Sequence, residues 1–250
     1  MKVLLKKIRV MMMTMMMTTL SSVTSMEFAH YFKVDVVYPD LSGCYLGHKE
    51  VDSILKCAHY CHVNEATCTF FCLTETGCDL YSALVSRHYT GVGGVPSAAC
   101  YSSWGRSNEA AHTAVISASP PLKSRFEIAN PTTGFFCWDE STFCYHSEVT
   151  SSAWWMADLG TPRKVTSVTF HTRRSTTHSP HFSNVEVRVG YDSQDFKNNE
   201  LLGSYEASAS HRETVTFATN HYITGSIVTI QNDQGQNKAI MFCDVQIVYM

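Results

Sequence analysis

The chain has 250 residues, of which 44% are hydrophobic and 16% are charged, and its formal net charge is −3 at pH 7. An acidic chain with no segment dense in Lys and Arg lacks the positive charge that neutralises phosphates, so we exclude nucleic acid as a partner. The length allows one large or two small domains. The hydrophobic content is enough for ordinary cores.

The first 25 residues are typical of an export signal. Four basic side chains are followed by an apolar run over residues 10–20 and by a small-residue cleavage site at residues 23–25. The run is shorter than the ~20 residues of a membrane-spanning helix. We therefore expect a signal peptide over residues 1–25 and a secreted protein, with a retained membrane anchor as the alternative. Cleavage removes four basic and no acidic side chains, which takes the formal charge from −3 to −7.

The cysteines divide the rest of the chain into two parts. Seven of the ten lie between residues 44 and 100, and the others are Cys137, Cys144 and Cys243. At this density, an exported chain is expected to form disulfides. The stretch from residue 102 to residue 124 is rich in Ser, Ala and Pro and shows no sustained period. We expect a disulfide-rich domain over residues 40–103, a linker over 104–124 and a second domain over 125–250.

The first domain is expected to combine a helix with a small sheet. Residues 51–63 predict a helix, because apolar side chains recur at helical offsets and Cys57 and Cys61 lie on one face. The runs 69–71 and 79–81 predict strands beside it. Bridges between helix and sheet would hold a domain too small for a large core. A zinc site made from the cysteines and histidines of this helix is the alternative.

One cysteine pattern carries a family resemblance. A pair of cysteines on the helix is followed by further cysteines and apolar residues at fixed spacing, as Cys57-x3-Cys61-x6-Cys68-x2-Phe71 and Cys78-x-Leu80. This pattern resembles the PAN/Apple family. The resemblance implies three bridges: Cys57–Cys78, Cys61–Cys68 and Cys44–Cys100. Cys72 is then left over, and it could replace Cys68, stay free or pair with Cys137 and so join the two domains.

From residue 151 onward, the chain predicts an antiparallel β-sandwich. Period-2 alternation or short apolar runs occur in four segments: KVTSVTF (164–170), VEVRV (185–189), SIVTI (226–230) and VQIVY (245–249). Gly160-Thr161-Pro162 and Gly225 predict turns between strands. The fold class is therefore mainly β, with a small disulfide-rich α+β module followed by an antiparallel β-sandwich or jelly roll.

The second domain also resembles a known family. The string WWMADLG (154–160), followed by KVTSVTF, VEVRVG and FCDVQI (242–247), is similar to discoidin-like jelly rolls and, within them, to the F-type (fucose-binding) lectins. The resemblance covers about residues 110–249 and implies a Cys144–Cys243 disulfide. The two tryptophans have a simpler explanation as large hydrophobes that fill the sandwich, while Asp158 caps a turn.

The resemblance implies a carbohydrate site on loops at one end of the sandwich. Its candidate residues are His146, Arg174, His181 and Phe182. His181 stands where the family has a second Arg, so one guanidinium group with its five N–H donors is replaced by an imidazole with at most two. Such a loss weakens polar recognition by about 1.5–3 kcal/mol, so a sugar other than fucose, or no sugar, is the alternative. Arg173, His171 and His178 add further donors to the cluster.

The same resemblance implies a structural calcium ion. In the family, loop carbonyls and carboxylates hold it, and the equivalent loop here is 128–134. Asp244 follows the last cysteine and fits one ligand position, whereas Asn130, in Ala129-Asn130-Pro131, stands in the loop where the family has an Asp. Asn130 and Asp244 are therefore the candidate metal ligands, in an environment with fewer charged oxygens than calcium prefers.

These features predict a secreted, non-catalytic, lectin-like or adhesion protein whose partners are glycans or glycoproteins. The PAN-like module is a candidate surface for protein contacts and for homo-oligomers, which would raise the avidity of a weak sugar site. The alternative is an extracellular protein-interaction or matrix component that uses the sandwich only as a scaffold. No G-x-S-x-G, H-E-x-x-H, P-loop or G-x-G-x-x-G motif favours an enzyme.

Overall fold

The computed structural model describes eight stretches of the chain: residues 31–34, 41–63, 68–89, 99–103, 110–137, 143–173, 181–232 and 237–250. The expected signal peptide, residues 1–25, lies outside them, as does the candidate residue Arg174. Within the described stretches, no helix has both the length and the apolar character needed to cross a membrane.

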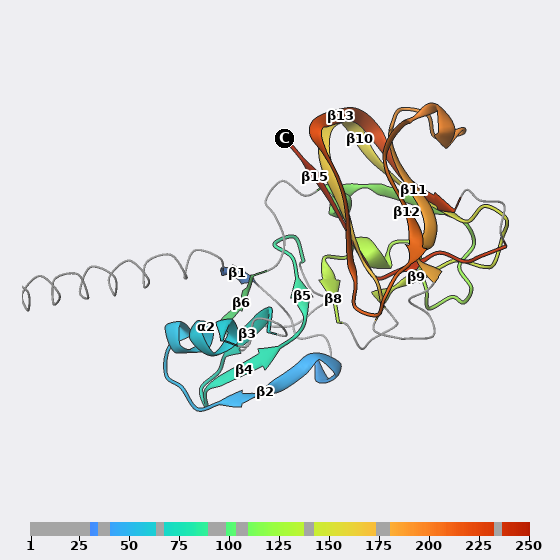
Figure 1. The fold of residues 1–250 in the computed structure, drawn as a ribbon. Helices are drawn as coiled ribbons and strands as arrows, with labels where there is room; N and C mark the ends of the chain where they lie inside the picture. The colour runs from blue at the N-terminus through green and yellow to red at the C-terminus, as the bar shows by residue number, and fades with distance from the viewer. Residues whose placement is uncertain are drawn as a thin grey trace, which may run out of the picture.

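The cysteine-rich part consists of one α-helix on a five-stranded antiparallel sheet (Figure 1). The strands lie in the order β1 (Phe32–Val34), β6 (Ala99–Ser102), β3 (Phe70–Leu73), β4 (Cys78–Tyr81) and β2 (Tyr45–Lys49). Helix α2 (Ile54–His62) begins after Ser53, whose hydroxyl accepts a hydrogen bond from the backbone N–H of Lys56. Its buried residues Cys57, Ala58 and Cys61 pack against β3 and β4. The predicted helix and both predicted strands are therefore present.

All ten cysteines are in disulfides, and two of the pairs correct the expected pattern. The pairs are Cys44–Cys137, Cys57–Cys78, Cys61–Cys68, Cys72–Cys100 and Cys144–Cys243. The expected Cys44–Cys100 pair is wrong, because Cys72 on β3 lies directly opposite Cys100 on β6. Cys137 does join the two parts of the chain, but its partner is Cys44 and not Cys72. The other three pairs agree with those that the two resemblances implied.

The second part is an antiparallel β-sandwich, as the sequence predicts. Its main sheet has the order β12 (Glu200–Ser208), β11 (Ser183–Gly190), β13 (Thr214–Asn232), β10 (Trp154–His171) and β15 (Asp244–Tyr249), and β7 (Val115–Ala118) also pairs with β10. Strand β9 (Tyr145–His146) pairs with β14 (Met241–Phe242). Alternate residues of β11, namely Val185, Val187 and Val189, are buried in the core. Short 3-10 helices are η2 (Ser42–Cys44), η3 (Ala111–Thr113), η4 (Asn130–Thr132) and η7 (Phe196–Asn198).

Strands β10 and β13 are long and continue through the glycines that the sequence placed in turns. The pairing of β10 with β13 shifts register between Asp158 and Arg163, which is the mark of a bulge. Gly160 lies in this shift with a φ of 72°, a backbone conformation that glycine adopts readily. The Asp158 carboxylate accepts a 2.8 Å hydrogen bond from the Gly160 N–H, so the predicted capping role of Asp158 is confirmed.

Part of the expected linker belongs to the sandwich. Strand β7 pairs with β10, and the Ala110 N–H donates a 2.9 Å hydrogen bond to the Ile247 carbonyl. This corrects the linker prediction for residues 110–119, where the four-residue strand β7 is too short to show a readable period. The two parts of the chain are also joined by pairing of β5 (Leu84–Val85) with β8 (Phe135–Phe136), which lie between them in Figure 1.

Candidate functional site

Two of the sequence-predicted site residues meet at one end of the sandwich. His146 ends β9, and His181 lies just before β11. His181 Nδ1 and His146 Nε2 are 2.9 Å apart and share a hydrogen bond, although the residues are 35 positions apart in the sequence. His146 is only 2% exposed, whereas His181 is half-buried. The ring that solvent and solutes can reach is therefore that of His181.

The hydrogen bond between the imidazoles restricts what each ring can do. Only one of the two facing nitrogens can carry a hydrogen, because two N–H groups cannot donate to each other. Either the His181 Nδ1 donates to His146, or the His146 Nε2 donates to His181. In both cases the contact fixes the orientation of the His181 ring, and the choice of donor decides whether its outer nitrogen donates or accepts.

One arginine lies next to this histidine pair through Phe126, and a second arginine lies close to the first. The guanidinium of exposed Arg125 lies 4.8 Å from the ring centroid of Phe126, and that ring packs edge to face on His146 with a centroid separation of 5.4 Å. Burial, followed by the positive charge of Arg125, lowers the pKa of Arg173. Arg173 belongs to the donor cluster that the sequence predicts. Arg125 was missed, because it lies in an irregular segment 21 residues before His146.

The predicted ligand role of Phe182 is wrong. Its side chain is 0% exposed and packs in the sandwich core, with its ring 5.5 Å from that of Phe170. A side chain with no solvent exposure cannot form the wall of a sugar site. His171, also placed in the donor cluster, is buried as well, and its Nδ1 donates a 3.1 Å hydrogen bond to the Asp244 carboxylate.

The candidate metal ligands Asn130 and Asp244 fit calcium poorly. The Asn130 amide nitrogen donates to the carbonyl oxygens of Arg125 and Cys144, at 3.0 Å and 3.3 Å. These two carbonyl oxygens therefore already accept hydrogen bonds from the neutral Asn130 amide. A carboxylate oxygen of Asp244 likewise accepts a hydrogen bond from His171. Nowhere in the described stretches do three or more His, Cys, Asp or Glu side chains form a group that could hold a metal ion. Calcium prefers several charged oxygens, which this arrangement does not supply.

We therefore expect that a chelator does not change the thermal stability of the protein. An ion that binds only the native state raises the melting temperature by mass action, so its removal would lower that temperature. Differential scanning calorimetry with and without excess EDTA measures the effect, and added calcium serves as the matched condition. A melting temperature that falls in EDTA and recovers with calcium would instead support a metal site at Asn130 and Asp244.

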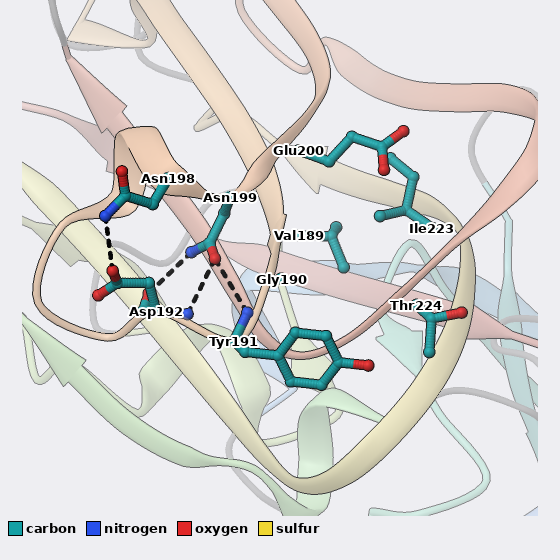
Figure 2. Close-up of a pocket in the computed structure, with 9 residues that line it drawn as sticks. All are labelled: Val189, Gly190, Tyr191, Asp192, Asn198, Asn199, Glu200, Ile223 and Thr224. Atoms are coloured by element: carbon teal, nitrogen blue, oxygen red, sulfur yellow. Dashed lines mark hydrogen bonds between the residues drawn. The ribbon is translucent and has the colours of Figure 1, made fainter.

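A cavity of about 300 Å³ lies at the other end of β11 (Figure 2). Gly190 lines it, and the eight-residue strand places Gly190 roughly 23 Å from Ser183, at about 3.3 Å per residue. The Asn199 amide oxygen accepts from the N–H groups of Tyr191 and Asp192, both at 2.9 Å. Hydrogen bonds from the Asn198 side chain and from two backbone N–H groups lower the pKa of Asp192. This network holds the loop 191–199 in one conformation.

Comparisons with known proteins agree with this architecture. Residues 137–239 match a family model for F5/F8 type C domains, described as a NedA-like, galactose-binding domain. Among solved structures, the chain is similar to a fucolectin from the serum of striped bass (Morone saxatilis), with 22% identity and a TM-score of 0.52. That alignment covers 56% of this chain and 48% of the fucolectin chain, so the match spans about half of the fucolectin. A search of curated proteins found no match.

Two bacterial carbohydrate-binding modules are more distantly similar. One is a fucose-binding module of Streptococcus pneumoniae, with 15% identity, a TM-score of 0.45 and coverage of 57% of this chain and 95% of that chain. The other is the family 32 module of C. perfringens NanJ in complex with galactose, with 13% identity, a TM-score of 0.45 and coverage of 56% and 97%. The strand order and the similarity to the striped bass fucolectin define the class of fold, which is a lectin-like, discoidin-like β-sandwich that follows a disulfide-rich region.

Proposed function

We propose that this chain is a non-catalytic glycan-binding protein whose site is the loop end around His181. The observation that carries the proposal is the His146–His181 hydrogen bond, with Arg125 next to it through Phe126 and Arg173 close to Arg125. Sugar hydroxyls and ring oxygens accept hydrogen bonds, and this end of the sandwich gathers donors in an otherwise acidic chain. The galactose-binding family model and the fucolectin-like fold support this proposal.

The residues take different roles in the proposed site. His181 and the two arginines are the groups that contact the sugar, since each has solvent exposure. Arg174 is proposed as a further donor from the sequence alone, because it lies outside the described residues. His146 is a positioning residue, because it is 2% exposed and acts through its hydrogen bond to His181. Hydrogen bonds to charged donors contribute about 1.5–3 kcal/mol each.

The rest of the chain suits an extracellular lectin. All ten cysteines are oxidised, which supports the proposed signal peptide and export through an oxidising compartment. We also propose, from the cysteine pattern, that the first module is PAN/Apple-like, with Cys57 of α2 bridged to Cys78 of β4. We propose that this module makes protein contacts or forms homo-oligomers, and that several weak sugar sites then act together.

Glycan-array binding of the purified mature protein tests the proposed site. We expect binding to glycans that end in galactose or fucose, and we expect His181→Ala to weaken it by up to about tenfold, through loss of one direct hydrogen bond. His146→Ala should also weaken binding, whereas His146→Gln should retain more of it, because an amide can take over the hydrogen bond to His181. His221→Ala is the matched control, since His221 is exposed and lies on β13 outside the proposed site.

Two outcomes would contradict the proposal. One is that neither the wild-type protein nor any variant binds a glycan on the array. The other is that His181→Ala binds as strongly as wild type. If no glycan on the array binds, and the protein captures a protein partner even in the presence of excess free sugar, the alternative is favoured in which the sandwich serves only as a scaffold for protein contacts.

A further inference from the structure

A groove of about 560 Å³ lies on the outer face of the sandwich, away from the His181 site. Its floor follows from strand alternation. Side chains of β10 alternate between the two faces of the sheet. Trp154 and Met156 are partly exposed on the outer face, whereas Trp155 and Ala157 are buried on the inner face. In the antiparallel register, Gln231 of β13 lies opposite Trp154 and therefore shares its face. Ser117 of β7 lies opposite Met156 in the same way.

The loop 191–199 forms the wall of this groove. Phe196 packs edge to face on Trp154, with ring centroids 5.4 Å apart. Figure 2 shows the hydrogen bonds of Asp192 and Asn199 that hold the base of the loop. The Asp195 carboxylate also accepts from the Lys197 N–H at the start of η7. The position of Phe196 over Trp154 is therefore fixed by the fold before any ligand arrives.

The chemistry of the lining matches a neutral sugar. The groove residues are Ser117, Ser152, Trp154, Met156, Ser193, Gln194, Asp195, Phe196, Lys197 and Gln231. Two aromatic rings and a thioether offer apolar surface for the C–H face of a pyranose, and the serine and glutamine side chains offer both donors and acceptors for hydroxyls. One lysine beside one aspartate gives no excess of positive charge for an anion. The volume lies within the ~300–1,000 Å³ of small-ligand sites.

The two neighbouring tryptophans differ in their ring nitrogens. The Trp155 Nε1–H donates a 2.9 Å hydrogen bond to the Ile128 carbonyl. The Trp154 Nε1–H makes no hydrogen bond to any residue that the structure describes. A partly exposed indole with an available donor, next to a second aromatic ring, is suited to a ligand that carries hydroxyl groups. We propose that this groove, defined by Trp154, Phe196 and Gln231, is a second saccharide site that takes a neutral hexose or disaccharide.

The test follows the indole N–H signal of Trp154 by NMR in the ¹⁵N-labelled protein. Lactose, maltose and chitobiose are the neutral probes, added at millimolar concentration. We expect at least one of them to shift this signal to saturation. Phe196→Ala should lower the affinity for the sugar about tenfold, because one aromatic contact contributes on the order of a factor of ten in affinity. His221→Ala, a control on β13 outside both proposed sites, should leave the affinity unchanged.

His181→Ala separates this inference from the proposed function. We expect the variant to lose array binding at the loop end and to keep the Trp154 response. The inference is overturned if no neutral probe shifts the Trp154 signal, if only a sulfated disaccharide shifts it, or if His181→Ala abolishes the shift. Trp154→Phe guards against a folding defect in Phe196→Ala, because it keeps an aromatic ring on the groove floor and removes the indole donor. Its binding is followed through the side-chain amide signal of Gln231, which also lines the groove. Binding should be weakened while the melting temperature is retained.

Discussion

Replacement of Trp155 by alanine is expected to lower the free energy of unfolding by about 3–5 kcal/mol, the usual cost of removing a large buried aromatic side chain. Trp155 is 0% exposed and packs edge to face on Phe242, with ring centroids 5.5 Å apart. The change would also leave the carbonyl of half-buried Ile128 without the indole donor that it now has. Urea unfolding followed by circular dichroism measures the loss.

Trp154→Ala is the matched control, because the same side chain is removed from the adjacent position. Trp154 faces outward and is only partly buried, so its removal should cost about 1 kcal/mol, mainly from the contact with Phe196. If the two variants lost equal stability, the assignment of Trp155 to the core and Trp154 to the outer face would be wrong.

Removal of the Cys144–Cys243 disulfide is expected to have an effect of similar size. The two cysteines are 99 residues apart, and the chain-entropy relation gives ~4.7 kcal/mol for a loop of about one hundred residues. Cys144 lies two residues before His146, and Cys243 separates β14 from β15. The double variant Cys144→Ala/Cys243→Ala should therefore be strongly destabilised and should also lose glycan binding. Urea unfolding without reductant and array binding are the two measurements.

The Cys61–Cys68 disulfide supplies the control. Its cysteines are only 7 residues apart, and the same relation gives about 2.4 kcal/mol. Cys61→Ala/Cys68→Ala should therefore destabilise the protein less, and the binding at the loop end should persist. A larger loss from the short loop than from the long loop would contradict this account of the Cys144–Cys243 bridge.

Local patterns predicted most of the fold. The apolar repeat of residues 51–63 gave α2, and the alternation of VEVRV and VQIVY gave β11 and β15. Strand β7 was missed, because Val115–Ala118 is short and its partner β10 follows more than thirty residues later. The pairing of Cys72 with Cys100 depends on the register of β3 against β6, and sequence spacing does not contain that register.

The candidate site was predicted only in part. His146 and His181 were both named from the sequence, and the fold brings them into hydrogen-bond contact. Phe182 was assigned to the ligand side, although its side chain points into the core, and a change of one position in a strand reverses the face of a side chain. Arg125 was missed because its proximity to the pair depends on tertiary contacts through Phe126.

The most direct test of the proposed glycan site is a crystal structure of the protein with the glycan that binds best on the array. We expect a sugar ring at the loop end, within hydrogen-bond distance of His181 and of Arg125 or Arg173. A sugar bound in the Trp154 groove alone would contradict the proposed site and would leave the second site in place. The absence of bound sugar at the loop end, with the glycan at saturating concentration, would also contradict it.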